Sequence, residues 1–320
     1  MQLKDLLIRQ SKNKSLAVNY KNQFLSYEDL YIEVNSVLKH INSIDVQISA
    51  NVGIFLPNSI EYIIAYFSIT FNDKVIVPIP IQFSNNDIQK TVEFCEMNFI
   101  ITNSNYKKRI LELFEILKVK IIVYVIDEKK YEVLNSNGNE ICDVNSYSNL
   151  TPDVALMLAT SGTTSNPKRV MLTHKNLISN IESVIKSHNY NSDDNTLIFL
   201  PLYFGYCNTS QFLTHFYLGA TLTIMDNIFL PNKFLKIIED KRITNLTAVP
   251  TMLMLLLKNG DINRYNPLPG RLYRRASKIA PPTKKIPITV KIEEMAAVGC
   301  SIRRPITSPM TADPIPNKSE

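Results

Sequence analysis

Cysteine is scarce in this sequence of 320 residues, and its placement argues against both a disulfide framework and a metal centre. The four cysteines are scattered, and no two of them have the spacing of zinc ligands; they are Cys95, Cys142, Cys207 and Cys300. Three of them fall in or beside apolar runs. The pattern therefore predicts buried free thiols in a reducing compartment rather than a disulfide framework or a metal centre.

Long apolar runs are also missing. The longest, such as residues 62–71, are too short or too interrupted to cross a bilayer. The opening residues, Met-Gln-Leu-Lys-Asp, do not have the layout of a signal peptide. Together with the free thiols, these features predict a cytoplasmic protein without a membrane span.

Basic charge is not in excess along most of the chain, although the formal net charge is +6. Up to Asn266 there are 25 basic and 25 acidic residues, and the last 54 residues contain 10 basic and 4 acidic ones. A protein that binds nucleic acid needs a basic surface to meet the phosphate backbone. The neutral body therefore predicts that nucleic acid is not a partner.

Continuous apolar runs alternate with amphipathic stretches over the first 266 residues. Residues 52–56, 75–79 and 99–102 are typical of strands buried on both faces of a parallel sheet. Helical patterns lie between them, for example over residues 60–70 and 86–97. The alternation predicts an α/β fold with two βαβ-type subdomains, in which mostly parallel sheets are flanked by helices.

A polar stretch over residues 127–153 predicts a loop or linker between a first subdomain (1–150) and a second (151–266). The composition changes abruptly after Asn266. Asn falls from 31 residues before position 267 to one after it, whereas Pro goes from 8 to 9 in a much shorter segment. We therefore expect residues 267–320 to be an atypical tail, disordered or out of register, such as a frame disruption, truncation or fusion remnant. The alternative is a flexible basic tail.

One loop has the composition of a phosphate site. Four hydroxyl residues surround one glycine between two strand-like runs, and a lysine follows; the residues are Thr160, Ser161, Gly162, Thr163, Thr164 and Lys168. Hydroxyls and backbone N–H groups can donate to phosphate oxygens, and the ammonium offsets their charge. Composition alone also fits an ordinary Ser/Thr-rich turn. The loop is not of the Walker A type, because Pro167 stands where that motif needs its second glycine and Arg169 follows the lysine.

The order Thr-Ser-Gly-Thr-Thr, followed after two residues by Pro-Lys, resembles the phosphate loop of the adenylate-forming superfamily, with seven positions in agreement over residues 160–168. This superfamily of AMP-binding enzymes includes acyl-CoA synthetases, luciferases and the adenylation domains of peptide synthetases. Further segments are similar to it, so that the resemblance covers about residues 20 to 266 and only the N-terminal portion of such an enzyme; these segments are 24–30, 52–59, 200–203, 218–221 and 247–251.

The sequence also departs from the family pattern. Ser165 and Arg169 stand where the family has glycines, and a side chain would strain the loop if either position required a positive φ. The motif Tyr-Gly-x-Thr-Glu, whose glutamate helps to hold Mg²⁺ in the family, is absent. We expect the ribose-binding region and the C-terminal domain with its catalytic lysine to lie beyond the end of this chain.

The resemblance implies an AMP-forming acid–thiol ligase. In such an enzyme a carboxylate and ATP give an acyl adenylate, and a thiol of CoA or of a phosphopantetheine carrier protein then accepts the acyl group. The implied cofactors are ATP and Mg²⁺, and Thr160, Ser161, Gly162, Thr163, Thr164 and Lys168 would bind the β- and γ-phosphates. The missing motif and domain predict an impaired enzyme with no assignable catalytic residue. The alternative is an inactive remnant that only binds nucleotide or a partner.

The resemblance also places the wall of an acyl pocket at Tyr203, Phe204, Gly205 and Tyr206, although aromatic residues there could equally be core. Relatives that activate amino acids often have an aspartate near Gly205, which pairs with the substrate ammonium. The glycine therefore favours a fatty or other apolar carboxylic acid, and a role in fatty acid metabolism. His174 is expected to start a helix and His215 to be packed, with no companion residues for metal or triad chemistry.

Overall fold

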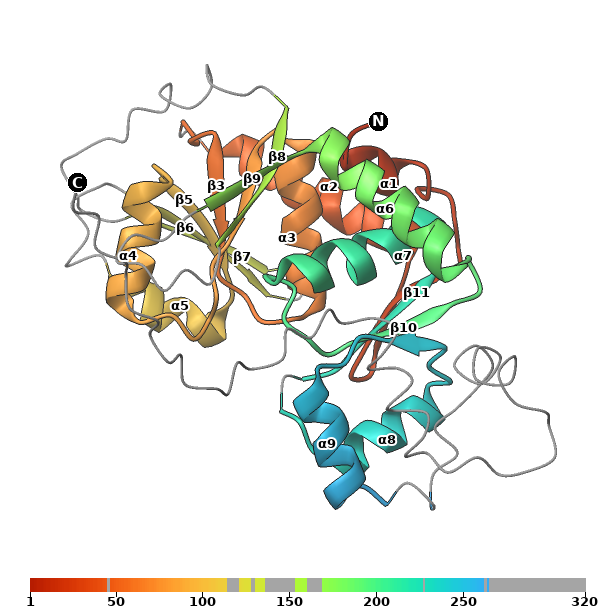
Figure 1. The fold of residues 1–320 in the computed structure, drawn as a ribbon. Helices are drawn as coiled ribbons and strands as arrows, with labels where there is room; N and C mark the ends of the chain where they lie inside the picture. Colours follow the sequence, from red (N-terminus) through yellow and green to blue (C-terminus); the bar gives the residue numbers. More distant parts are fainter. Residues whose placement is uncertain are drawn as a thin grey trace, which may run out of the picture. The chain divides into compact units, whose positions relative to one another are not determined.

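The computed structural model describes residues 1–44, 47–113, 121–127, 130–135, 153–159, 169–226, 228–261 and 264 (Figure 1). The helices are α1 (Lys4–Ile8), α2 (Tyr27–Ser43), α3 (Ile60–Phe71), α4 (Asn85–Phe94), α5 (Ser104–Leu111), α6 (His174–His188), the π-helix η1 (Cys207–Leu213), α7 (Thr214–Leu218), α8 (Pro231–Asp240) and α9 (Pro250–Asn259). The strands are β1 (Leu16–Tyr20), β2 (Gln23–Ser26), β3 (Asn51–Ile54), β4 (Val75–Pro78), β5 (Phe99–Thr102), β6 (Ile122–Asp127), β7 (Lys130–Asn135), β8 (Val154–Ala159), β9 (Arg169–Thr173), β10 (Asn195–Ile198), β11 (Thr221–Ile224) and β12 (Asn245–Leu246).

The strands form two sheets, and both are mostly parallel. The larger has the order β7-β6-β5-β3-β4-β8-β9, with antiparallel strands only at its two edges. The smaller has the order β12-β10-β11-β1-β2, in which only β2 is antiparallel. Both sheets contain strands from each side of residue 150, where the sequence predicts the boundary between two subdomains. The mostly parallel sheets with flanking helices confirm the predicted α/β fold class.

The alternation of side chains along each central strand divides the core into three clusters. In β6, Tyr124 belongs to the cluster that also contains residues of the smaller sheet, whereas Val123 belongs to a cluster on the opposite face with α4 and α5. In β10, Ile198 joins the first cluster and Leu197 joins a third one with α8 and α9. The result is a layered arrangement in which helices α2, α3, α6 and α7 share the cluster common to the two sheets (Figure 1).

Hydroxyl side chains cap the starts of two helices. Ser26 caps α2, because its Oγ accepts a hydrogen bond from the Asp29 backbone N at 3.0 Å, and the Asp29 carboxylate accepts from the Ser26 backbone N. Thr173 does the same for α6, because its Oγ1 accepts from the Asn176 N at 3.1 Å. This cap starts α6 at His174, directly after β9, as the sequence predicts.

The linker predicted over residues 127–153 is wrong in its first part, because residues 130–135 form β7 and pair with β6 in antiparallel register. The short alternation of Tyr131 and Val133 with charged neighbours lets one side of this edge strand pack on the core. Charged residues on an edge strand discourage pairing with other chains, and they also gave this segment the composition of a loop. The predicted atypical tail, 267–320, lies outside the described residues.

Two of the four cysteines lie in the described part of the chain. Cys95 and Cys207 are buried thiols that form no disulfide, which confirms the sequence prediction for these two. Burial raises the pKa of the Cys207 thiol, which therefore stays protonated. Cys142 and Cys300 fall outside the described residues.

Candidate active site

The carboxyl ends of the parallel strands of the two sheets meet at Asn58. This residue follows β3 of the larger sheet, and its side chain is 4% exposed. Its Nδ2 donates to the Leu200 carbonyl at 2.9 Å, and its Oδ1 accepts from the Leu202 N at 2.8 Å. Both partners follow β10 of the smaller sheet. Because ligands of open α/β sheets bind outside the carboxyl ends of the strands, this junction is the candidate site.

The four residues predicted to wall an acyl pocket come directly after this junction. We call residues 203–206 the acyl wall. The rings of Tyr203 and Phe204 pack against each other with centroids 4.7 Å apart. Phe204 and Tyr206 are 52% and 57% exposed, so neither is a core residue. The acyl wall therefore presents aromatic surface at the carboxyl edge, and its role in binding an acid stays a prediction.

The acyl wall also touches the strand that leads to the predicted phosphate loop. A Cβ added to Gly205 would lie 3.0 Å from Cδ1 of Leu158 in β8. Residues 160–168 themselves, including all six predicted phosphate ligands, lie outside the described residues. Their two flanks are described, since Ala159 at the end of β8 pairs with Arg169 at the start of β9. The antiparallel pairing holds the two ends of the loop side by side at the carboxyl end of β8.

The pairing also answers one question about Arg169, which replaces a family glycine. Its backbone lies in β9, and it is not among the residues with positive φ in the described part of the chain. An extended backbone accepts any side chain. The backbone at this position therefore does not require a glycine; the other departure, Ser165, lies outside the described residues.

A buried network supports the acyl wall from behind. Asn208 in η1 donates from Nδ2 to the Leu202 carbonyl at 3.1 Å, and its Oδ1 accepts from the hydroxyl of Tyr66 in α3 at 3.1 Å. Its backbone N donates to the Phe204 carbonyl at 2.9 Å. Burial raises the pKa of Tyr66, so that its hydroxyl stays a donor. Asn58, Tyr66 and Asn208 were not predicted from the sequence as site residues.

A second contact, also missed from sequence, reaches the acyl wall from the larger sheet. Gln82 lies in the loop after β4, and its Nε2 donates to the Tyr203 hydroxyl. The guanidinium of Arg109 in α5 donates to the carbonyls of Ile81 and Phe83, on either side of Gln82. The Arg109 guanidinium also lies 5.5 Å from the ring centroid of Phe55. The 81–83 loop is thus held in place from α5.

Burial raises the pKa of Tyr203, and the hydrogen bond from Gln82 opposes that rise only in part. The Tyr203 hydroxyl therefore keeps its proton at neutral pH.

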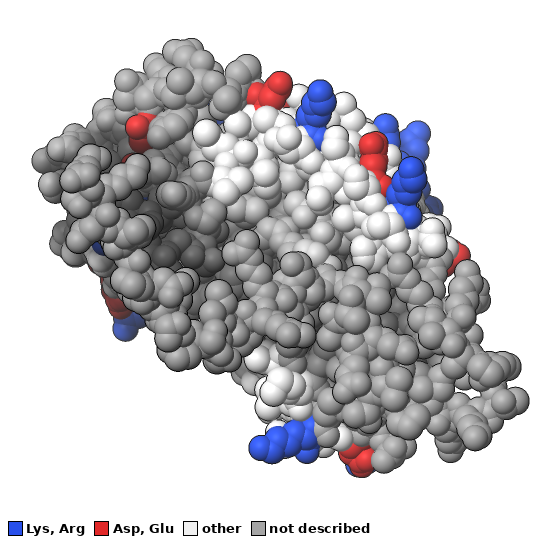
Figure 2. Space-filling model, in the orientation of Figure 1, with Lys and Arg blue, Asp and Glu red and all other residues white. Residues whose placement is uncertain are grey.

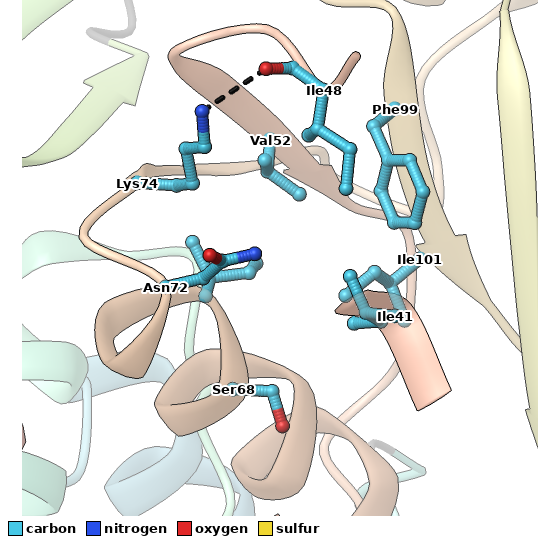
Figure 3. A pocket seen from close by; sticks show the side chains of 9 residues that line it. Ile41, Ile48, Val52, Ser68, Asn72, Lys74, Phe99 and Ile101 are labelled. Atoms are coloured by element: carbon cyan, nitrogen blue, oxygen red, sulfur yellow. Dashed lines mark hydrogen bonds between the residues drawn. The ribbon is translucent and has the colours of Figure 1, made fainter. Parts of the chain in front are cut away.

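Another hollow lies at the opposite, amino ends of the strands. Figure 3 shows its apolar lining, which includes Ile41 at the end of α2, Val52 in β3 and Phe99 in β5. At its mouth the Lys74 Nζ donates to the Ile48 carbonyl at 3.0 Å, and burial lowers the pKa of Lys74. Its place at the amino edge separates this hollow from the junction at Asn58.

The described residues have mixed charge on the face in Figure 2 and no cluster of metal-binding side chains. On the face in Figure 2, basic side chains are interspersed with acidic ones. Among the residues that the structure describes, no group of three or more His, Cys, Asp or Glu side chains could hold a metal ion. No helix in the same residues is both long and apolar enough to span a bilayer.

The two histidines singled out from the sequence are structural. His174 begins α6, and its Nδ1 accepts from the Leu3 backbone N at 3.1 Å, which ties the N-terminus to this helix. Burial lowers its pKa. His215 is fully buried, with Nδ1 2.7 Å from the Gln211 carbonyl, and burial lowers its pKa to about 4.

Two mostly parallel sheets that meet at their carboxyl edges, with a hydroxyl-rich loop after β8, define a nucleotide-type α/β architecture. A family model described as AMP-binding enzyme matches residues 8–289. The chain therefore belongs to the AMP-binding enzyme family, which confirms the resemblance found in the sequence.

Similar proteins agree with this assignment. The chain is 25% identical over 256 residues to 4-coumarate--CoA ligase 1 of Arabidopsis thaliana, covering 75% of this chain and 45% of that protein. It is 26% identical over 271 residues to 4-coumarate--CoA ligase 2 of Nicotiana tabacum, covering 81% and 49%. The chain thus spans about half the length of the curated relatives it matches.

Solved structures share the fold. o-Succinylbenzoate CoA synthetase from Bacillus subtilis, in complex with its acyl-adenylate intermediate, superposes with a TM-score of 0.65 at 21% identity, covering 80% of this chain and 64% of that one. McyG A-PCP, complexed with phenylalanyl-adenylate, gives a TM-score of 0.68 at 17% identity, covering 83% and 44%. At such identities the likeness shows the fold alone.

Proposed function

We propose that this chain forms the part of an adenylating enzyme that binds the phosphates of ATP and a carboxylic acid. The reaction is the activation of the acid as an acyl adenylate with release of pyrophosphate, followed by transfer of the acyl group to a thiol. The observation that carries the proposal is the position of the motif at 160–168: it joins β8 to β9 at the carboxyl edge, and β8 contacts the acyl wall through Leu158 and Gly205.

The chemistry asks the protein mainly to position groups and to stabilise charge. The carboxylate oxygen forms a bond to the α-phosphorus, and the bond to the pyrophosphate oxygen breaks. Thr160, Ser161, Gly162, Thr163, Thr164 and Lys168 would hold the β- and γ-phosphates and so stabilise the departing pyrophosphate. Tyr203, Phe204, Gly205 and Tyr206 would hold the tail of the acid beside them.

The acid and the thiol acceptor are less closely defined. The absence of a carboxylate at Gly205 favours an acid without an ammonium group. The names of the relatives pair 4-coumarate with CoA, and one structural neighbour is a complex with phenylalanyl-adenylate, so these two comparisons give no support to a preference for fatty acids. CoA is the acceptor that the relatives' names suggest, and a carrier-protein phosphopantetheine is the alternative. Participation of Mg²⁺ and a cytoplasmic location stay predictions.

The test is carboxylate-dependent exchange of labelled pyrophosphate into ATP, catalysed by the 320-residue chain with a panel of aromatic and aliphatic acids. Exchange that appears only when an acid is added supports the proposal. Binding of ATP without exchange for any acid would favour the competing proposal, a remnant that retains only nucleotide binding.

Lys168 offers a sharper test of the phosphate loop. An ammonium in contact with phosphate contributes a charge-assisted hydrogen bond, so Lys168→Ala should weaken ATP binding about 10- to 100-fold. Lys175→Ala is the matched control, because Lys175 is an exposed residue of α6 only seven positions later. Equal effects of the two substitutions, measured by calorimetric titration with ATP, would count against the loop assignment.

A further inference from the structure

We propose that Gln82 is a specificity-determining residue of the acid site, and that with Tyr203 it binds a neutral hydroxyl group on the tail of the acid. The inference rests on the proposed function, since it concerns the same site. Three features carry it: the way the 81–83 loop is held, the hydrogen-bonding capacity that the pair leaves unused, and the absence of charge around it.

The first feature is the restricted position of Gln82 and its side chain. Exposed glutamines ordinarily sample many rotamers, and ordering one has an entropic cost. Here the guanidinium of Arg109 binds the carbonyls on both sides of Gln82, and its own plane lies near the ring of Phe55. The side chain then reaches Tyr203, 121 positions later in the sequence. A side chain held in this way can make a directional contact with little further ordering.

The second feature is the hydrogen-bonding capacity that Gln82 and Tyr203 leave unused. The Gln82 amide donates to the Tyr203 hydroxyl, and in the described part of the chain neither the amide oxygen nor the hydroxyl proton has a further partner. If the amide were turned around, the hydroxyl would donate to its oxygen, and the amide N–H groups and a hydroxyl lone pair would be left. In both orientations the pair offers at least one donor and one acceptor side by side. An alcohol or phenol, which both donates and accepts, matches that pair.

The third feature is the absence of charged groups in the acyl wall. The acyl wall contains no ionisable carboxylate or amine, and Tyr203 keeps its proton because burial raises its pKa. Arg109, the cation that binds the 81–83 loop, faces two carbonyls and a ring rather than the wall. A tail with an ammonium or a second carboxylate would find no counter-charge in this contact. A hydroxylated acid with an uncharged tail is the chemical class that fits.

The experiment compares acids that differ by one hydroxyl: 3-phenylpropanoate with 3-(4-hydroxyphenyl)propanoate, and octanoate with 8-hydroxyoctanoate. Pyrophosphate exchange and ligand-observed NMR binding are both measured on the full chain. One extra hydrogen bond predicts a preference for the hydroxylated member of about 3- to 10-fold in at least one pair. That preference should fall to about one in Gln82→Leu and in Tyr203→Phe, and should persist in the control Gln89→Leu, which lies on α4 and pairs with Glu93.

The outcomes separate this inference from the proposed function. Exchange with no hydroxyl preference, or with a preference that survives Gln82→Leu, would overturn the role of Gln82 and leave the proposed function standing. Hydroxyl-dependent binding without exchange would support the role of Gln82 and remove the proposed catalysis. Neither exchange nor binding of any of the four acids would overturn both.

Discussion

Asn58 joins the carboxyl edges of the two sheets, and its replacement by alanine should lower stability well beyond the effect of an ordinary surface change. The substitution leaves the buried Leu202 N–H without its acceptor. The Leu200 carbonyl keeps one partner, because it also accepts from the Cys207 thiol at 3.1 Å. One orphaned buried group at about 1–3 kcal/mol and one weakened group at up to about 1 kcal/mol together predict a loss of about 1–4 kcal/mol.

Urea unfolding followed by circular dichroism measures this loss. Asn86→Ala is the matched control, since Asn86 is an exposed residue of α4 and should change the free energy of unfolding by less than about 0.5 kcal/mol. A loss for Asn58→Ala that equals the control would refute the reasoning, because the junction would then not depend on the two hydrogen bonds.

Asn58→Asp sharpens the same argument through pH. The carboxylate still accepts from the Leu202 N but repels the Leu200 carbonyl, whereas the protonated acid can donate to it. Burial and that repulsion should raise the pKa of the introduced acid above its ordinary value. The aspartate variant should therefore approach wild-type stability below about pH 4 and lose it as the pH rises through the raised pKa. A deficit independent of pH would show that the carbonyl does not face the side chain.

Two further predictions concern buried contacts. Burial lowers the pKa of His215 to about 4. Its neutral form therefore stabilises the fold fully above pH ~6.5, and that contribution is lost as the pH falls toward 4. The urea midpoint of His215→Leu should fall less over this pH window than that of the wild type, and parallel curves would contradict the reasoning. Gly205→Val should destabilise by about 1–3 kcal/mol through overpacking against Leu158; in a double-mutant cycle with Leu158→Ala, strictly additive losses would mean that the two residues do not touch.

The parts of the fold that could be predicted are those in which local pattern and burial coincide. The apolar runs that became β3, β4 and β5 are buried on both faces, so continuous hydrophobicity indicates them without knowledge of their partners. β7 was missed because the charged residues of this edge strand gave the segment the composition of a loop. The pairing of β1 with β11 was also beyond reach, since no periodicity encodes which distant strand becomes a neighbour.

The candidate site divides in the same way. The acyl wall and the phosphate loop were proposed from the sequence because their order along the chain resembles a family motif, and both assignments stay predictions. Asn58 and Gln82 were not identified as site residues, since each acts through a partner more than a hundred positions away, Leu200 and Tyr203 respectively. An isolated Asn or Gln has many structural uses, and only the three-dimensional neighbour selects one.

The place of β1 in the smaller sheet has a consequence for synthesis of the chain. Thr221, at the start of β11, donates from its hydroxyl to the carbonyl of Leu16, 205 positions earlier. A ribosome that adds about 5–20 residues per second needs roughly 10–40 s to make the intervening chain. A hairpin of two strands is only marginally stable by itself. The β1–β2 hairpin leaves the ribosome long before β11, the parallel neighbour of β1, has been synthesised. The time during which its open edge can pair wrongly is therefore set by the speed of translation rather than by the folding rate.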